Sequence, residues 1–434
     1  MTRFALLLLV VAPLALRAQD TAAAPVALTL EQAITRGRER GINAALARLN
    51  ERVAQARITQ RRADLLPAVG VSANWSRKTL NLDEFGIPIA TGVTDPFSLW
   101  NFQVRASETL FDASTLTRLR AAKDSALASG ADARAVGELA GAQAGLAYLR
   151  AVSAGETVRA READSAVAGD LLGQARQLVE AGVSPAIDAT RSEVQFASVR
   201  TQLEVARNQR DRTLLDLARA LDLPAGTPIT LADSLSAGST ALPGTPDAAV
   251  QFALEHRAEV AAERGRTRVI ERTLKAIGYE YLPSLAVGGQ YVQSGRELGT
   301  LEGTWLVQAG LSVPLFDGFR RPARQQEQSL RLEAQRLRLH DTEQQVATEA
   351  RQALLDLSSA GHQVELAGER LRLAERELAQ ARERFAAGVA GSVETTQAQG
   401  GLVAARDALI QARVNAAVAR VSARRALGVL DQAQ

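Results

Sequence analysis

The chain contains no cysteine. Structural disulfides, thiol catalysis, cysteine-based metal sites and a lipid anchor on an N-terminal cysteine are therefore excluded. Histidine is also scarce, and its three positions, His256, His340 and His362, lie far apart without metal-site spacing. No glycine-rich phosphate loop follows a predicted strand, and no serine or aspartate has a recognisable activating neighbour. We therefore expect a protein that is not an enzyme and that holds no cofactor or metal.

Large side chains and lysine are rare as well. Aromatic residues make up only 4% of the 434 residues, and lysine occurs at only three positions. An alanine-rich chain with so few large side chains suits long helices packed side by side better than a thick globular core. Arginine supplies nearly all the positive charge and alternates with glutamate along the predicted helices. Because the formal net charge is only +3, we expect no nucleic-acid partner.

A long apolar run occurs only at the N-terminus. The run directly follows the positively charged Arg3 and extends over 13 residues, from Phe4 to Leu16. It is shorter than the roughly 20 residues that a membrane-spanning helix needs. Residues 1–18 are therefore predicted to be a secretory signal peptide, with an uncleaved anchor helix as the alternative. Beyond them the longest stretch without charge has 15 residues and is largely polar. An exported chain of this kind can enter a membrane only as a closed β-barrel.

Two matching stretches indicate that the chain is one unit written twice. Leu315-Phe316-Asp317 lies 205 residues after Leu110-Phe111-Asp112, and a long helical pattern follows each. The predicted parts are a first repeat at 19–224, a connector rich in Pro, Gly and Ser at 225–246, and a second repeat at 247–434.

Each repeat contains two stretches in which apolar and polar residues alternate. This alternation is typical of a strand with two unlike faces. The predicted strands cover residues 67–77 and 99–110 in the first repeat, and 283–293 and 304–314 in the second. Each has roughly the ten residues that a tilted strand needs to cross a bilayer, so we expect one face toward lipid and the other toward water.

Aromatic residues collect at these strands. The windows 75–111 and 279–319 contain 12 of the 17 aromatic residues. Tryptophan and tyrosine prefer the boundary between membrane and water. We therefore predict that Trp75, Trp100, Tyr291 and Trp305 lie at that boundary. The alternative is a pair of small hairpins that cap a soluble helical bundle.

Long helices make up most of the remaining chain. A first, short helix is predicted to begin after Thr29 and to be broken at Gly37 and Gly41. The long helices are predicted at residues 113–181 and 186–222, and again at 320–387 and 392–430. Apolar residues recur every seven positions in them, with alanine at the offset position, which favours a closely packed coiled coil. Gly182 and Gly388 are predicted to end the first helix of each pair in the left-handed conformation.

The predicted fold class is mainly α with a small β part: long coiled-coil helical hairpins plus four membrane strands per chain. Four strands cannot close a barrel, and open strand edges are not tolerated in lipid. Three copies would provide twelve strands, an even number in the range of known barrels. Their helical hairpins would then form a second, helical tube.

The ordered set of motifs resembles the TolC family of outer membrane factors. The resemblance rests on Thr29-Leu-Glu-Gln-Ala, the two Leu-Pro strand starts, the two Leu-Phe-Asp junctions, the two Ala-Gly-Val turns and His256-Arg-Ala-Glu-Val. It implies a homotrimer in the cell outer membrane, with the helical part in the periplasm. It also implies a periplasmic adaptor protein, an inner-membrane transporter and outer-membrane lipid as partners.

The resemblance further implies roles for residues at the helical turns. Gly182-Val183 and Gly388-Val389 match the tips that contact the adaptor. Asp188 and Glu394, six residues beyond each glycine, match acidic positions where the family narrows the periplasmic end of the channel. The simpler alternative is that both acids favour a helix N-terminus. The sequence has Phe385 and Ala390 where the best-known member of the family has a tyrosine and an arginine that lock the closed gate, so a closed state must be held differently.

The expected function is the exit duct of a tripartite efflux pump, a passive conduit from an adaptor and transporter to the exterior. The exit duct of a type I protein secretion system is an alternative within the same class. A periplasmic adaptor or a soluble coiled-coil scaffold would be alternatives of another class. The duplication opposes the adaptor, and the leader with both strand hairpins opposes the scaffold.

Overall fold

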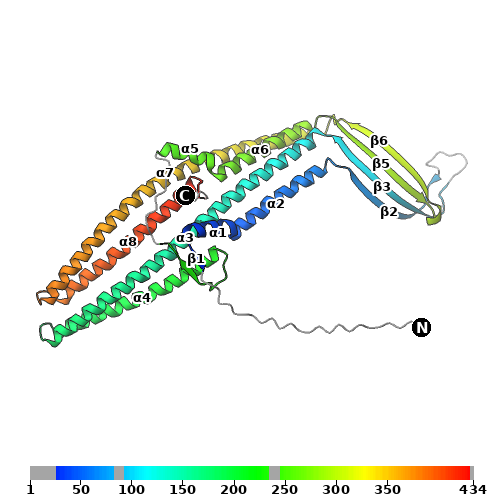
Figure 1. The fold of residues 1–434 in the computed structure, drawn as a ribbon. Helices are drawn as coiled ribbons and strands as arrows, with labels where there is room; N and C mark the ends of the chain where they lie inside the picture. Colours follow the sequence, from blue (N-terminus) through cyan, green and yellow to red (C-terminus); the bar gives the residue numbers. More distant parts are fainter. Residues whose placement is uncertain (1–25, 83–91, 234–244, 431–434) are drawn as a thin grey trace, which may run out of the picture.

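The computed structural model describes residues 26–82, 92–233 and 245–430, so the predicted signal peptide lies outside the described residues. A four-stranded sheet forms one end of the elongated molecule, and the turns of two long helical hairpins form the other (Figure 1). Short helices and a sheet of two short strands lie around the middle. Among the described helices, none combines the length and apolar character needed to span a membrane.

The two halves of the chain repeat the same order of elements. The first half contains β1 (Val26–Leu28), α1 (Leu30–Arg40), α2 (Ile42–Ala63), β2 (Ala68–Lys78), β3 (Phe97–Phe111), α3 (Ala113–Glu180) and α4 (Ala186–Ala220). The second contains β4 (Ile229–Leu231), α5 (Pro246–His256), α6 (Ala258–Tyr279), β5 (Ser284–Gly295), the 3-10 helix η2 (Leu298–Thr300), β6 (Glu302–Ser312), α7 (Arg320–Ala386) and α8 (Ser392–Ala426). The predicted class, mainly α with a small β part, is confirmed.

The long helices α3 and α7 connect the two ends of the molecule. α3 has 68 residues and α7 has 67, which at ~1.5 Å per residue gives each a length on the order of 100 Å. Near the tips α3 packs on α4, and α7 packs on α8. Toward the sheet α2 packs on α3, and α6 packs on both α3 and α7. Small residues let these helices approach closely: a Cβ on Gly265 of α6 would lie 2.8 Å from Ala128 Cβ of α3.

The prediction that Gly37 breaks the first helix is wrong. α1 begins as expected, because Thr29 and Gln32 form a reciprocal capping box. It then runs through Gly37 and ends at Gly41. The reason lies in packing: a Cβ on Gly37 would lie 2.4 Å from Ala144 Cβ of α3, so glycine allows α1 to cross α3 closely.

Some observed ends differ from the predicted ends. β3 starts at Phe97, two residues earlier than expected, and β6 stops at Ser312, just before Val313 and Pro314, because proline cannot donate to a strand ladder. α8 ends at Ala426 rather than at 430. Gly428 takes φ +71, and the Val429 N–H donates to Arg424 O at 2.9 Å, a helix-ending arrangement.

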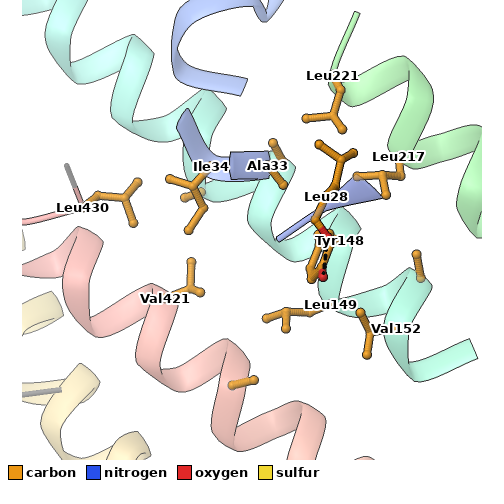
Figure 2. Packing of buried hydrophobic residues seen from close by; sticks show 14 residues of the cluster. Leu28, Ala33, Ile34, Tyr148, Leu149, Val152, Leu217, Leu221, Val421 and Leu430 are labelled. Atoms are coloured by element: carbon orange, nitrogen blue, oxygen red, sulfur yellow. Dashed lines mark hydrogen bonds between the residues drawn. The ribbon is translucent and has the colours of Figure 1, made fainter. Parts of the chain in front are cut away.

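The main core lies at the middle of the molecule around Tyr148 of α3 (Figure 2). Tyr148 is fully buried among residues of α1, α4 and α8. Its hydroxyl donates to Leu28 O at 3.0 Å and accepts from Asp233 N at 3.1 Å. Burial raises the pKa of Tyr148 to about 12, partly offset by that backbone N–H. One side chain thus joins the N-terminal strand to the segment that follows β4.

Two features of this region were missed by the sequence analysis. β4 lies inside the predicted connector and pairs in parallel with β1, with Ala27 opposite Thr230. Strands of three residues are too short to show an alternating pattern. α6 was also missed, and it occupies in the second repeat the place of α2 in the first.

Candidate functional site

The sheet at the end of the molecule has the antiparallel strand order β2-β3-β5-β6. β2 and β3 form the hairpin of the first repeat, and β5 and β6 form that of the second. The inner strands β3 and β5 join the two hairpins, with Val104 opposite Tyr291. β2 and β6 are therefore the two outer edges of the sheet.

One face of this sheet is apolar and exposed. Trp75 lies opposite Trp100, and Tyr291 lies opposite Trp305. Because directly opposed residues point to the same side of a sheet, and Val104 opposes Tyr291, all four predicted boundary aromatics share this face. Trp305 is 78% exposed. Such a large exposed apolar face is typical of a surface that contacts lipid or another protein.

Aromatic residues form two bands at the ends of the strands. The band near the hairpin turns contains Trp75, Trp100, Tyr291 and Trp305. The band near the helices contains Phe111, Tyr279, Tyr281, Phe316 and Phe319. From Trp100 to Phe111 the strand rises roughly 35 Å, which at a tilt of about 45° gives about 25 Å, the height of the apolar band of a membrane barrel. The boundary role of the first band remains a prediction.

The opposite face is mainly polar or carries small residues, with Leu99, Val292 and Leu306 among the apolar exceptions. Gln103 Nε2 donates to Gln290 Oε1 at 2.7 Å, and Arg105 donates to the same oxygen at 3.3 Å. Gly70 and Gly310 also belong to this face. This face can border water, whereas the apolar face cannot do so without cost.

A Leu-Phe-Asp motif forms the junction between the second strand of each hairpin and the long helix that follows, β3 with α3 and β6 with α7. Asp112 caps α3, since its carboxylate accepts from Ser114 N at 2.8 Å and Thr115 N at 3.2 Å. Burial alone would raise the pKa of Asp112, but these bonds and the Thr115 hydroxyl hold it below its ordinary value. In the second repeat Asp317 accepts from Arg321 N at 3.0 Å. At both junctions the aspartate thus satisfies backbone N–H groups at the start of the long helix.

The two helical turns have the same geometry. Gly182 takes φ +71 and Gly388 takes φ +69, values that favour glycine. The Val183 N–H donates to Leu178 O at 2.9 Å, and the Val389 N–H donates to Arg384 O at 3.0 Å, the pattern of a Schellman cap. Val183 and Val389 are both exposed, so each tip presents an apolar side chain.

The two predicted constriction acids differ in their surroundings. Asp188 is buried, and Ser392 Oγ donates to its Oδ1 at 2.5 Å while Ser184 Oγ donates to its Oδ2 at 2.6 Å. Glu394 is 44% exposed and pairs with Arg384 Nε at 3.0 Å. Asp188 therefore joins the two hairpins within one chain, whereas Glu394 is half-buried and pairs within its own hairpin.

The carboxylate of Asp188 also serves the start of α8. Burial alone would raise the pKa of Asp188, but the Ser184 and Ser392 hydroxyls and the Ser392 backbone N–H lower it below the ordinary value. The N-cap of α8 is Gly391, which has no side chain to offer. Asp188, from the other repeat, satisfies this helix end. Phe385, close by on α7, is buried.

A buried ionic cluster farther from the tips was missed by the sequence analysis. Asp164 of α3 is only 1% exposed and accepts from Arg161 Nη1 at 2.7 Å. Arg406 of α8 also binds Asp164, and Asp407 binds Arg161. The cluster ties α3 to α8. The sequence carries one signal of it: Arg161 interrupts the apolar seam of its helix.

Three comparisons with known proteins agree with this geometry. A family model described as "Outer membrane efflux protein" matches residues 35–222 and 249–429. The alkaline protease secretion protein AprF of Pseudomonas aeruginosa is 24% identical over 266 residues, and the match covers 58% of this chain and about half, 54%, of that relative.

Solved channels share the fold. The open-state MtrE outer membrane channel of Neisseria gonorrhoeae superposes with a TM-score of 0.78 at 20% identity, over 92% of this chain and 88% of MtrE. The outer membrane protein VceC of Vibrio cholerae gives a TM-score of 0.78 at 16% identity, over 92% of this chain and 96% of VceC. Since the family model spans most of both repeats, the chain belongs to the outer membrane efflux protein family.

Proposed function

We propose that this chain forms a trimeric channel in the outer membrane and serves as the exit duct of a tripartite efflux pump. The observation that carries the proposal is the four-stranded sheet, which has one apolar exposed face, one polar face and two unpaired edges. Lipid tolerates no open edge, so several copies must complete one barrel. The family consists of channel proteins rather than enzymes, in keeping with a passive conduit.

Three copies suit the sheet. They would provide a barrel of twelve strands, wide enough for a water-filled lumen lined by the polar face with Gln103, Arg105 and Gln290. The apolar face would contact outer-membrane lipid. The helical hairpins would extend the lumen into the periplasm as a tube on the order of 100 Å long.

The far ends of the hairpins are the proposed contact with other pump components. Val183 and Val389 protrude from matched, glycine-capped turns. Exposed apolar side chains on a rigid turn suit a protein contact. We propose that a periplasmic adaptor protein binds these tips and connects the channel to an inner-membrane transporter.

The acids near the tips are proposed to have separate tasks. The side chain of Glu394 is 44% exposed, and threefold symmetry would place three such carboxylates at the narrow periplasmic end, where they would concentrate cations. Asp188, also expected at the constriction, would hold the tips together through Ser392. The bond between Asp188 and Ser392 would hold a closed state in this chain, which has Phe385 and Ala390 where the best-known member of the family has the tyrosine and arginine that lock its gate.

Protein secretion is the second candidate for the conduit. The similarity to AprF, named for alkaline protease secretion, favours it. A strain lacking this chain separates the candidates: increased sensitivity to small toxic compounds indicates efflux, and loss of one secreted protein from the medium indicates secretion. Complementation by the intact gene is the control.

The channel itself is tested by fractionation, gel migration and conductance. The chain should fractionate with outer membranes, migrate as a heat-modifiable trimer and give discrete conductance steps in planar bilayers. A periplasmic adaptor or a soluble scaffold would give none of the three. A photoreactive cross-linker on a Val183→Cys variant should capture an adaptor protein at the tip, whereas the same label on Val205→Cys, exposed on the side of α4, should not.

A further inference from the structure

The two edge strands of the sheet, β2 and β6, indicate how neighbouring copies of the chain pair. This inference rests on the proposed trimer and goes beyond it. Every residue of β2 and β6 is exposed, whereas the inner strands β3 and β5 contain many partly buried positions. Both edge strands are 11 residues long. Long, exposed edges pair readily with another strand, and a second copy of this chain provides the complementary edge.

The duplication of the chain supplies a register for this contact. Leu66–Ser76 and Leu282–Val292 align without a gap at an offset of 216, and Trp100–Asp112 and Trp305–Asp317 align at an offset of 205. Trp75 pairs with Trp100 in the first hairpin, and their counterparts Tyr291 and Trp305 pair in the second. The two hairpins therefore have the same register.

The contact between β3 and β5 is the template for the contact between copies. This contact joins β3, the second strand of the first hairpin, to β5, the first strand of the second hairpin, with Arg105 opposite Gln290. The edge strands β6 and β2 are the counterparts of β3 and β5. The offset of 205 makes Gly310 of β6 the counterpart of Arg105, and the offset of 216 makes Asn74 of β2 the counterpart of Gln290.

We propose that β6 of one copy pairs antiparallel with β2 of the next copy, with Gly310 directly opposite Asn74. The same register sets Leu311 opposite Ala73 on the apolar face and Ser312 opposite Ser72 on the polar face. Each face thus continues across the contact without a change of character. A slip of one residue would turn Trp75 to the polar side, so all odd slips are excluded by the alternation.

The stagger of the strands selects among the even slips. Within one chain Trp100 opposes Gly295, which lies four residues beyond Tyr291, the counterpart of Trp75. A closed barrel requires a fixed stagger, and the proposed register repeats the same four-residue step between copies. A slip of two residues would bring Ser72 or Ser76 opposite Gly310 and make the steps unequal.

Disulfide trapping tests the register on a background without cysteine. Gly310→Cys is suitable because a Cβ there meets no atom within 4 Å. It is combined in turn with Asn74→Cys, Ser72→Cys or Ser76→Cys in the full-length chain, which is oxidised in outer membranes and run on gels with and without reductant. A disulfide requires Cβ atoms about 3.5–4.5 Å apart. Directly opposed residues come closest to this distance, at about 4.5–5.5 Å, whereas diagonal neighbours lie about 7–8 Å apart.

The expected result is a reducible ladder of two and three chains that forms at least tenfold faster for the Gly310→Cys/Asn74→Cys pair than for the other two pairs. Single-cysteine variants should give no ladder. Faster cross-linking through Ser72→Cys or Ser76→Cys overturns the register, as does a trimer, seen by heat-modifiable migration, in which no pair cross-links. A chain that stays monomeric in the membrane overturns the proposed channel as well, so the two failures are distinguishable.

Discussion

The bond between Ser392 and Asp188 allows a quantitative test of how the two tips are joined. Ser392→Ala removes a hydroxyl that donates to the carboxylate at 2.5 Å, while Ser184 keeps its own bond at 2.6 Å. One hydrogen bond to a charged group contributes about 1.5–3 kcal/mol. Since 1.4 kcal/mol is a factor of ten, the fraction of chains with separated tips should rise about 10- to 150-fold.

A buried cysteine can report this separation. Thr395 is 3% exposed and lies on α8, three residues beyond Ser392. Cysteine nearly matches threonine in volume, so Thr395→Cys should fold and react with a maleimide mainly when the tips open. Adding Ser392→Ala should accelerate that reaction about 10- to 150-fold. Thr213→Cys, buried on α4 far from the tip, is the matched control and should keep its rate.

Two results would refute this reasoning: an unchanged rate at Thr395→Cys, or an equal acceleration at Thr213→Cys, which would mean general destabilisation.

The pH dependence provides a second check. Hydrogen bonds hold the pKa of Asp188 below its ordinary value of 3.8 despite its burial. The folded pKa is depressed, so the stabilisation is complete above this value and is lost as pH falls through the folded pKa. A fluorescent label on Val389→Cys should therefore keep its spectrum from neutral pH to about pH 4 and change only below it.

Three further predictions concern the lumen, the core and the membrane face. Glu394→Gln should reduce the preference for cations in planar bilayers at low salt, because a proposed ring of three carboxylates is removed; unchanged reversal potentials would contradict this. Tyr148→Phe should destabilise the chain by roughly 1–3 kcal/mol through unpaired backbone groups. Because burial raises the pKa of Tyr148 to about 12, the wild type should lose about 2–3 kcal/mol more than the variant between pH 10 and 12, measured by denaturant unfolding. Val307→Arg on the apolar face should cost about 2–4 kcal/mol and reduce the heat-modifiable trimer, whereas Gln308→Arg, one residue along on the polar face, should be tolerated.

Local chemistry explains why the main elements could be predicted. Alternation identifies a strand because neighbouring side chains point to opposite faces, and β2 follows it from Val69 to Ser76 and β6 from Val307 to Ser312. Thr29 begins a helix because its hydroxyl satisfies a free N–H. Gly182 and Gly388 end helices because they accept positive φ without strain. Each of these signals depends on a few residues adjacent in sequence.

Contacts between distant segments account for what was missed. Gly37 resembles a helix breaker, but its lack of a Cβ serves the crossing with Ala144. Asp164 meets Arg406, and Arg161 meets Asp407, only because α3 and α8 lie side by side. Helical periodicity shows which face is buried and not which partner covers it.

The sequence by itself determined the duplication, the two faces of each strand and the positions of the helical turns, because all three are periodic or local properties of the chain. Only the tertiary structure decided that Asp188 is held by Ser392, 204 residues away, while Glu394 pairs with Arg384. Both acids stand six residues beyond a glycine cap. They differ because Ser392 of α8 reaches across to Asp188 of α4, whereas Glu394 pairs with Arg384 within its own hairpin.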